Sequence, residues 1–198
     1  MKNISITQEN IVKLMKKVKK TVETKDEPKR WRKYYGDVCA RIFREFILQE
    51  IPFEYTISPP NAYIEGFPTE FDLLAIDKNV YPMKYTNAYP PERIRCGIEI
   101  KAHGIFGGRK DLEKVAKKIK GNFDVVKSKY PHIDFIYLTY EEVAFPKREN
   151  SINYLEETKR MINPYRVFCL KDSRTAKLID GEWESFVSYL NHLFTKKR

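Results

Sequence analysis

One stretch in the middle of the chain constrains its fold most strongly. Residues 95–101 place apolar side chains at every second position, as a strand with one buried face does. Three glycines then lead into a basic segment at 109–129, which is predicted to be a helix, and an apolar strand is predicted at 134–140. A strand, a helix and a strand in succession indicate parallel neighbours joined by a right-handed crossover. The chain is therefore expected to be an α/β protein.

Further helices and strands are expected on both sides of this unit. Apolar residues recur at helical spacing in three other segments, which are 7–23, 30–49 and 183–194. Short apolar runs predict further strands at 54–57, 70–77 and 165–170. Prolines indicate that residues 78–93 form a loop. The expected fold is a central mixed β-sheet flanked by helices, with an N-terminal amphipathic helix and a C-terminal helix.

A chain of 198 residues fits a single domain spanning 1–198. We expect a basic helix at 1–27 to be appended to a core at 28–140, with a hinge near 24–28. Residues 141–198 are expected to add a C-terminal strand and helix.

The charge of the chain narrows the choice of partner. It has 37 Lys and Arg against 27 Asp and Glu, which gives a formal net charge of +10. Such an excess attracts polyanions through long-range steering and counterion release. Nucleic acid is the first expectation, ahead of an acidic protein or a membrane surface, while a generally lysine-rich soluble surface is the alternative.

Several classes of protein are disfavoured by what the sequence lacks. The three cysteines are far apart, which argues against a disulfide framework or a four-cysteine zinc site and favours reduced, packed thiols. No apolar run approaches the roughly 20 residues of a membrane span. The N-terminus leads into a polar, lysine-rich stretch and not into an apolar signal core. We therefore expect a cytoplasmic protein without a membrane partner.

A single carboxylate interrupts the most apolar of the predicted strands. The segment 71–76 is apolar except for Asp72. An unpaired carboxylate in such surroundings needs a cation, a hydrogen-bond partner or a proton. Asp72 is therefore a candidate functional residue.

Two charged residues lie near the end of the strand at 95–101. Because side chains alternate along a strand, Glu99 and Lys101 share one face, which we expect to point away from the core. If this strand pairs with the strand of Asp72 as two arms of a hairpin, two carboxylates and one ammonium group meet at one place.

Such a set of side chains suits phosphodiester hydrolysis. Two carboxylates favour Mg²⁺, with Mn²⁺ as a substitute, and the backbone carbonyl of Ile100 would add an oxygen ligand. The metal would polarise the phosphoryl group and activate a bound water. Lys101 would orient or deprotonate that water, or stabilise charge on the phosphoryl oxygens. The alternative is a structural salt bridge between Glu99 and Lys101, with Asp72 capping a turn.

The two segments that carry these residues resemble a known superfamily. They read Thr69-Glu70-Phe71-Asp72 and Ile98-Glu99-Ile100-Lys101. In this order they are similar to the PD-(D/E)xK nucleases, which include restriction-type endonucleases, resolvases and repair nucleases. The resemblance implies a restriction endonuclease-like core, with Asp72 and Glu99 as metal ligands and Lys101 as the catalytic lysine.

The chain departs from this pattern before the aspartate. The usual proline is replaced by Phe71, and Pro68 lies upstream. The long separation of the two motifs implies an inserted loop, which agrees with the prolines found there. The superfamily often has a further acidic residue on the preceding helix. Glu45 is our candidate for that role because its spacing tilts it toward the buried stripe, and Glu50 is the second choice.

Other basic residues are candidates for binding nucleic acid. His103, Arg109 and Lys110 follow the catalytic strand beside glycines that allow a backbone to approach phosphate. In the loop at 78–93, Lys84 and Arg93 are interleaved with tyrosines, which suits phosphate contact and base stacking. An ordinary strand-to-helix turn and a packed loop are the alternatives. For the lysines of the helix at 109–129, we expect a solvated face, with a DNA-binding flank as the second choice.

Three functions are consistent with the sequence. The first is a Mg²⁺-dependent endonuclease acting on double-stranded DNA, with a restriction-like role preferred over a structure-specific resolvase or repair role. A homodimer would suit symmetric cutting of both strands. The second is a catalytically silent nucleic-acid-binding module of the same fold. The third is an interaction protein whose basic N-terminal helix docks on an acidic partner or membrane surface.

Overall fold

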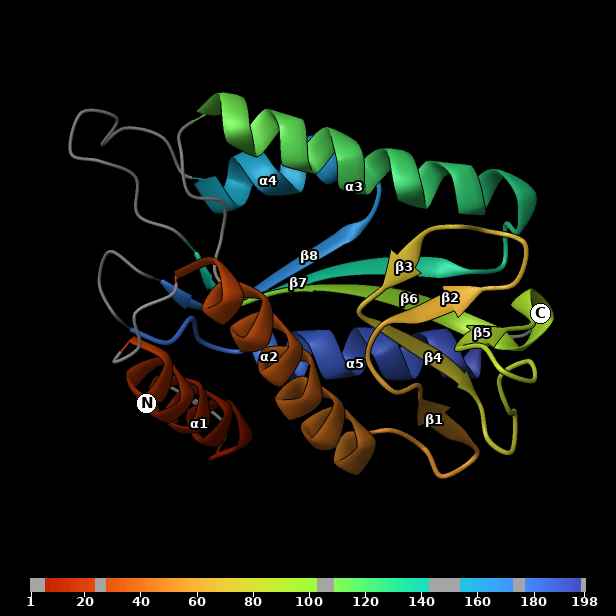
Figure 1. Cartoon of the computed structure of the whole chain (residues 1–198), viewed down its shortest axis with the longest axis horizontal. Coiled ribbons are helices and arrows are strands. Elements are labelled where there is room, and N and C mark those ends of the chain that lie inside the picture. Colours follow the sequence, from red (N-terminus) through yellow and green to blue (C-terminus); the bar gives the residue numbers. More distant parts are fainter. Residues whose placement is uncertain (1–5, 24–27, 103–108, 143–153, 173–176, 197–198) are drawn as a thin grey trace.

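A mixed sheet forms the centre of the molecule (Figure 1). The computed structural model describes residues 6–23, 28–102, 109–142, 154–172 and 177–196. Within these residues the main sheet has five strands in the order β1-β4-β6-β7-β8. They are β1 (Tyr55–Ile57), β4 (Leu73–Asp77), β6 (Ile94–Lys101), β7 (Asp134–Glu142) and β8 (Arg166–Asp172). β4 runs antiparallel to β1 and β6, whereas β6, β7 and β8 are parallel to one another.

The predicted crossover lies on this sheet. Helix α3 (Arg109–Lys129) comes between β6 and the parallel β7, and its bounds are those expected from the sequence. Its apolar residues pack toward the strands and are buried: Leu112, Ala116, Ile119, Phe123 and Val126. The α/β class and the mixed sheet are therefore confirmed.

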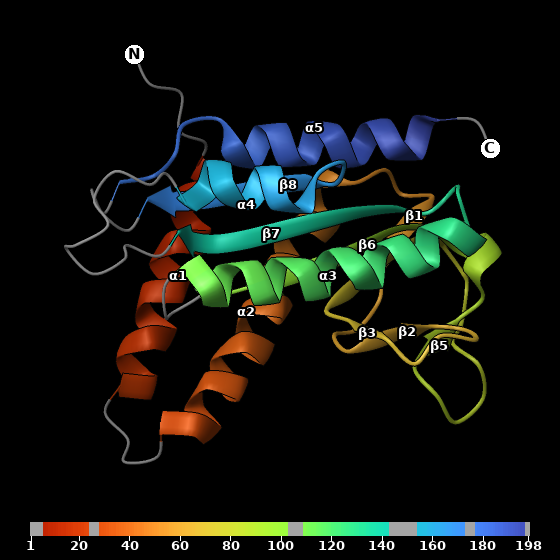
Figure 2. The ribbon, with the colours of Figure 1, turned by 90° about the horizontal axis from the view of Figure 1, so that it is seen from above.

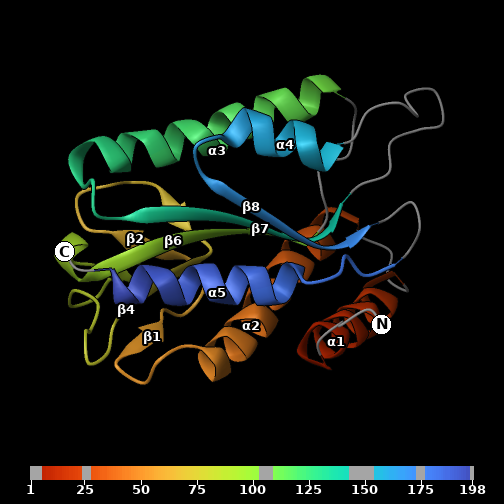
Figure 3. The same ribbon diagram turned by 180° about the vertical axis from the view of Figure 1, so that it is seen from behind.

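Both faces of the sheet carry an apolar core. The first core lies under α1 (Ile6–Glu23), α2 (Pro28–Glu50) and α5 (Glu182–Thr195), and Figure 3 shows α5 running along the strands. The second core lies under α3 and α4 (Tyr154–Ile162), which are neighbours in Figure 2. The predicted helices at 7–23 and 30–49 correspond to α1 and α2, and the closing helix corresponds to α5. Helix α4 was not expected from the sequence.

Helix α1 contributes directly to the first core. Its side chains Ile11 and Met15 are fully buried. In addition, the side-chain amide of Gln8 donates hydrogen bonds to the carbonyl oxygens of Leu170 (2.9 Å) and Ile179 (2.8 Å). The helix is thus tied to β8 and to the segment before α5. Most of the expected hinge at 24–28 lies outside the described residues.

A second, smaller sheet interrupts the expected order of elements. It consists of β2 (Ala62–Ile64), β3 (Glu70–Phe71) and β5 (Ala88–Tyr89), in the order β3-β2-β5. The prediction of one strand at 70–77 is therefore wrong in detail. The chain bends at Asp72 because β3 pairs with β2, whereas β4 pairs with β1 and β6. The expected loop at 78–93 likewise contains β5 and a short 3-10 helix at Pro91–Arg93.

The face of β6 that carries Glu99 is covered, so the prediction that it points away from the core is wrong. Gly97 on this face lies beneath the ring of Phe135, which belongs to the second core. A Cβ atom at Gly97 would lie 2.8 Å from two ring carbons of Phe135 and 3.2 Å from one of Phe71. Glu99 and Lys101, at the end of the strand, are partly exposed.

Replacing Gly97 by alanine is therefore expected to destabilise the protein. The added methyl group must displace packed aromatic rings, and overpacking of this kind costs about 1–3 kcal/mol of unfolding free energy. Urea unfolding followed by circular dichroism measures the loss. As a control, Gly121→Ala adds a methyl group on α3 where nothing lies within 4 Å. That variant should not be destabilised, because alanine favours a helix. Equal stability of the two variants would contradict the packing described here.

Two further expectations concern the cysteines and the membrane. Cys39, Cys96 and Cys169 are all free and buried, as predicted. Among the described residues, none of the helices combines the length and apolar character required to cross a lipid bilayer.

Candidate active site

Asp72 stands at the bend between β3 and β4. Its side-chain Oδ2 accepts a 2.6 Å hydrogen bond from the backbone N–H of Ile100 on the neighbouring strand β6. Its backbone carbonyl accepts a 3.2 Å hydrogen bond from the N–H of Asn61. Asn61 has a positive φ of 63°, which is the turn geometry expected near Pro59 and Pro60. The bend and these two bonds turn the carboxylate toward the end of β6.

Glu99 and Lys101 reach the same place from β6. Lys101 Nζ lies 2.5 Å from Glu99 Oε1 and 3.6 Å from Asp72 Oδ2. The ammonium group also donates a 3.2 Å hydrogen bond to the carbonyl oxygen of Ile100. The structure therefore brings together the three side chains that the sequence singled out, together with the backbone of Ile100.

These three groups are partly buried. The side chains of Asp72, Glu99 and Lys101 are 25%, 19% and 35% exposed. Burial raises the pKa of Asp72, against the opposing effects of Lys101 and the Ile100 amide. Burial also raises the pKa of Glu99, and the Asp72 carboxylate adds to that rise. Burial alone would lower the pKa of Lys101, but the two carboxylates outweigh it and raise this pKa.

The charges at this place do not balance. Two ionised carboxylates face one ammonium group, and burial makes the excess negative charge costly. A divalent cation would relieve that cost, and carboxylate and carbonyl oxygens are the ligands that Mg²⁺ prefers. The residues present therefore fit such an ion. No cluster of three or more His, Cys, Asp or Glu side chains occurs among the described residues, so the protein would supply few ligands and water the rest.

Two uncharged residues border the site and were not singled out from the sequence. Tyr137 on β7 is the cross-strand partner of Glu99 and is 2% exposed. Burial, and then the charge of Glu99, raises the pKa of Tyr137. Cys39 on α2 is fully buried, and burial and then the Asp72 carboxylate raise its pKa. The parallel register of β6 and β7 could have revealed Tyr137, whereas Cys39 looks like any other apolar helix position.

Glu45 does not belong to this group of residues. Its side chain is 68% exposed and lies 3.2 Å from the guanidinium of Arg44. The prediction that it tilts toward the buried stripe is wrong, because Phe43 and Ile47 form that stripe and Glu45 lies between them on the opposite side. Among the described residues, no hydrogen bond or ion pair joins Glu45 to the three side chains. Glu50, the second choice, instead accepts a 3.3 Å hydrogen bond from Thr7 on α1.

The candidates for nucleic-acid contact lie in different surroundings. Lys84 is exposed, and its ammonium lies 4.8 Å from the ring centre of Tyr85. Arg93 lies 3.6 Å from Asp77, which also pairs with Arg95. His103 and the side chains of Arg109 and Lys110 lie outside the described residues, although both of the latter begin α3.

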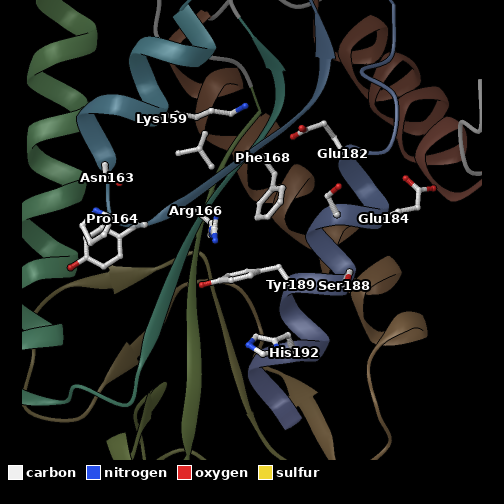
Figure 4. Close-up of a pocket in the computed structure, with 13 residues that line it drawn as sticks. Lys159, Asn163, Pro164, Arg166, Phe168, Glu182, Glu184, Ser188, Tyr189 and His192 are labelled. Atoms are coloured by element: carbon white, nitrogen blue, oxygen red, sulfur yellow. The ribbon is translucent and has the colours of Figure 1, made fainter. Parts of the chain in front are cut away.

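A pocket of about 930 Å³ lies elsewhere, between α4, β8 and α5 (Figure 4). Arg166, Phe168, Tyr189 and His192 are among the residues that line it. The guanidinium of Arg166 lies 5.3 Å from the ring centre of Tyr189. None of Asp72, Glu99 and Lys101 lines this pocket, so it is separate from the candidate active site.

The arrangement of helices and strands can be compared with that of known proteins. The mixed sheet, its β-α-β crossover and the helices on both faces match the α/β fold expected from the sequence. No protein-family model matches the sequence, and no curated protein matches it either.

Solved structures of NucC share this fold. NucC from P. aeruginosa ATCC27853, in its cAAA-bound form, has a TM-score of 0.58 at 10% identity, covering 96% of this chain and 92% of that one. NucC from E. coli MS115-1 gives TM-scores of 0.57 in its cAAA-bound form and 0.53 in its apo form. These two have 13% and 12% identity and cover 98% and 96% of this chain, and 92% of theirs. At such identities the similarity is one of fold.

Proposed function

We propose that this protein is a Mg²⁺-dependent endonuclease that hydrolyses phosphodiester bonds in DNA. The observation that carries the proposal is the convergence of Asp72, Glu99 and Lys101 at the junction of β4 and β6. The fold shared with NucC, an endonuclease of the PD-(D/E)xK fold, supports the same class of activity. Within that class, a restriction-like role in the cytoplasm is the specific form that we propose.

Each residue has a distinct role in this proposal. Asp72 and Glu99, with the carbonyl oxygen of Ile100, would hold the ion, which when bound polarises the phosphoryl group and activates a water. The amide of Ile100 fixes the Asp72 carboxylate through its 2.6 Å hydrogen bond. The two carboxylates raise the pKa of Lys101 against the effect of burial, which favours its charged form. That favours Lys101 as the group that stabilises charge on the phosphoryl oxygens over a role as base.

The choice of DNA rests on the net charge and on the basic residues that the sequence singled out. The net charge of +10 favours a polyanion. We propose that Lys84, Arg93, His103, Arg109 and Lys110 contact the nucleic acid. Phosphate contacts of this kind position a duplex without reading its sequence. A two-fold homodimer would place two such sites on the two strands of a duplex.

A second candidate function is a catalytically silent nucleic-acid-binding module. The observation that favours it is that each charged side chain already has a hydrogen-bond partner: Lys101 donates to Glu99, and Asp72 accepts from the Ile100 amide. In that case the three residues would hold β4 and β6 together. Binding would then depend on salt but not on a divalent ion or on Asp72.

Cleavage of a panel of nucleic acids separates the two functions. The protein is incubated in Mg²⁺ or in EDTA with five substrates: linear, supercoiled, branched and single-stranded DNA, and RNA. We expect cleavage of DNA in Mg²⁺ alone, its loss in Asp72→Asn, and its retention in the matched surface variant Glu45→Gln. Cleavage of the branched substrate alone would favour a resolvase or repair role. Intact substrates throughout, with salt-dependent binding, would favour the silent module.

A further inference from the structure

The lysines of α3 point in different directions. Lys120 lies 3.0 Å from Asp124, whose carboxylate also accepts a 2.7 Å hydrogen bond from the hydroxyl of Tyr165 next to β8. Lys127 lies 2.8 Å from Asp134 at the start of β7. Both lysines are therefore paired, and they lie on the flank of α3 that faces β7 and β8.

Lys118 lies on the other flank. Two residues along a helix turn by about 200°, so Lys118 points away from the side of Lys120. Lys129 shares its flank, because eleven residues make about three full turns. The ammonium of Lys129 lies 5.3 Å from the ring centre of Phe67, in the segment that leads from β2 to β3 and so to Asp72. The side of α3 that carries Lys118 therefore faces the chain segment that leads into Asp72.

The electrostatics agree with this placement. The pKa of Glu99 is raised chiefly by burial, and the charge of Lys118 is one of those that oppose the rise. Lys118 is exposed, and among the described residues it has no hydrogen-bond or ion-pair partner. An unpaired ammonium group beside a site with excess negative charge is well placed to bind a phosphate of an incoming strand.

We propose that Lys118 binds a phosphate group of the DNA strand next to the bond cleaved by Asp72, Glu99 and Lys101. This inference rests on the proposed nuclease function and adds a positioning residue to it. It also distinguishes among the lysines of α3: Lys118 contacts the substrate strand, whereas Lys120 and Lys127 stabilise the fold. A phosphate contact carries no sequence information, so Lys118 should act alike on every DNA sequence.

Substitution of two neighbouring lysines tests this inference. Lys118→Ala and Lys117→Ala each remove one positive charge from an exposed position of the same helix, so they change net charge and helix propensity equally. DNA binding is measured in EDTA over a range of salt concentrations, and cleavage is measured in Mg²⁺. For Lys118→Ala we expect the slope of log K against log salt to become less steep by about 0.9. KM should rise severalfold with little change in kcat. Lys118→Arg should restore both, and Lys117→Ala should resemble the wild type.

The outcomes separate this inference from the proposed function. If the wild type cleaves DNA and the two alanine variants have the same salt slope and the same KM, the role of Lys118 is wrong and the nuclease stands. If Lys118→Ala lowers kcat alone, Lys118 does not act through strand binding, and the inference is likewise wrong. If the wild type neither binds nor cleaves DNA, both proposals fail together.

Discussion

Replacing Lys101 by alanine is expected to lower kcat for DNA cleavage by about 10²–10⁴-fold, the range typical of a positioned acid, base or charge-stabilising group. The ammonium lies between the two carboxylates, 2.5 Å from Glu99 and 3.6 Å from Asp72. Its removal leaves two carboxylates partly buried without the positive charge that opposes their rise in pKa. Single-turnover cleavage of a labelled duplex in Mg²⁺ measures the loss.

The control for this variant must separate catalysis from folding. Lys101→Ala should show the circular dichroism spectrum of the wild type, since the side chain is 35% exposed and borders the cores. Lys117→Ala removes an equal charge from an exposed part of α3 and should retain full activity. A Lys101→Ala protein that is folded and cleaves within about tenfold of the wild type would exclude Lys101 from the catalytic role.

Phe135→Ala is expected to have the largest effect on stability, a loss of about 3–5 kcal/mol of unfolding free energy. Phe135 is 1% exposed, and its ring lies on those of Phe123 and Phe71, with centre distances of 4.7 Å and 5.6 Å. Tyr165 packs against its edge at 5.8 Å. Truncation opens a cavity in the second core that the neighbouring rings cannot fill. Urea unfolding of the variant and the wild type measures the loss, provided that the unfolding free energy of both depends on urea concentration with the same slope.

A double variant tests why Phe135 matters. Gly97→Ala should be destabilising in the wild type because the added methyl group meets the Phe135 ring at 2.8 Å. In the Phe135→Ala background that ring is absent, so the cost of Gly97→Ala should largely disappear. The two substitutions should therefore be strongly non-additive. Additive losses would mean that the Phe135 ring does not limit the space at Gly97.

Elements with long, regular apolar patterns could be predicted from the sequence. Helix α3 and strand β6 appear within one residue of their expected bounds, because many buried positions recur at a single period. The same alternation placed Glu99 and Lys101 on one face, and the antiparallel pairing of β4 with β6 then brought Asp72 beside them. The alternation of side chains along a strand and the pairing of two strands were sufficient to predict the candidate site.

The remaining differences arise where tertiary pairing outweighs local pattern. Strands β2, β3 and β5 have two or three residues each, too few to show a period. The break at Asp72 follows from pairing with two different sheets, which no local window can reveal. Glu45 was misplaced because it follows Val38 by seven residues and was therefore expected on the same, buried side of the helix. The buried stripe is instead centred on Cys39, Phe43 and Ile47. An error of one position in the centre of a helical stripe turns a side chain by about 100°.

The proposed activity requires the carboxylates of Asp72 and Glu99 to hold a divalent ion together. Electron paramagnetic resonance of Mn²⁺ measures this binding, because the signal of free Mn²⁺ falls as the ion binds, whether or not DNA is present. The wild type and Glu45→Gln are predicted to bind Mn²⁺ with equal affinity, and Mg²⁺ should compete for the site. The folded double variant Asp72→Asn, Glu99→Gln is predicted to lose this binding. Unchanged binding of Mn²⁺ by the folded double variant would mean that Asp72 and Glu99 do not hold the ion.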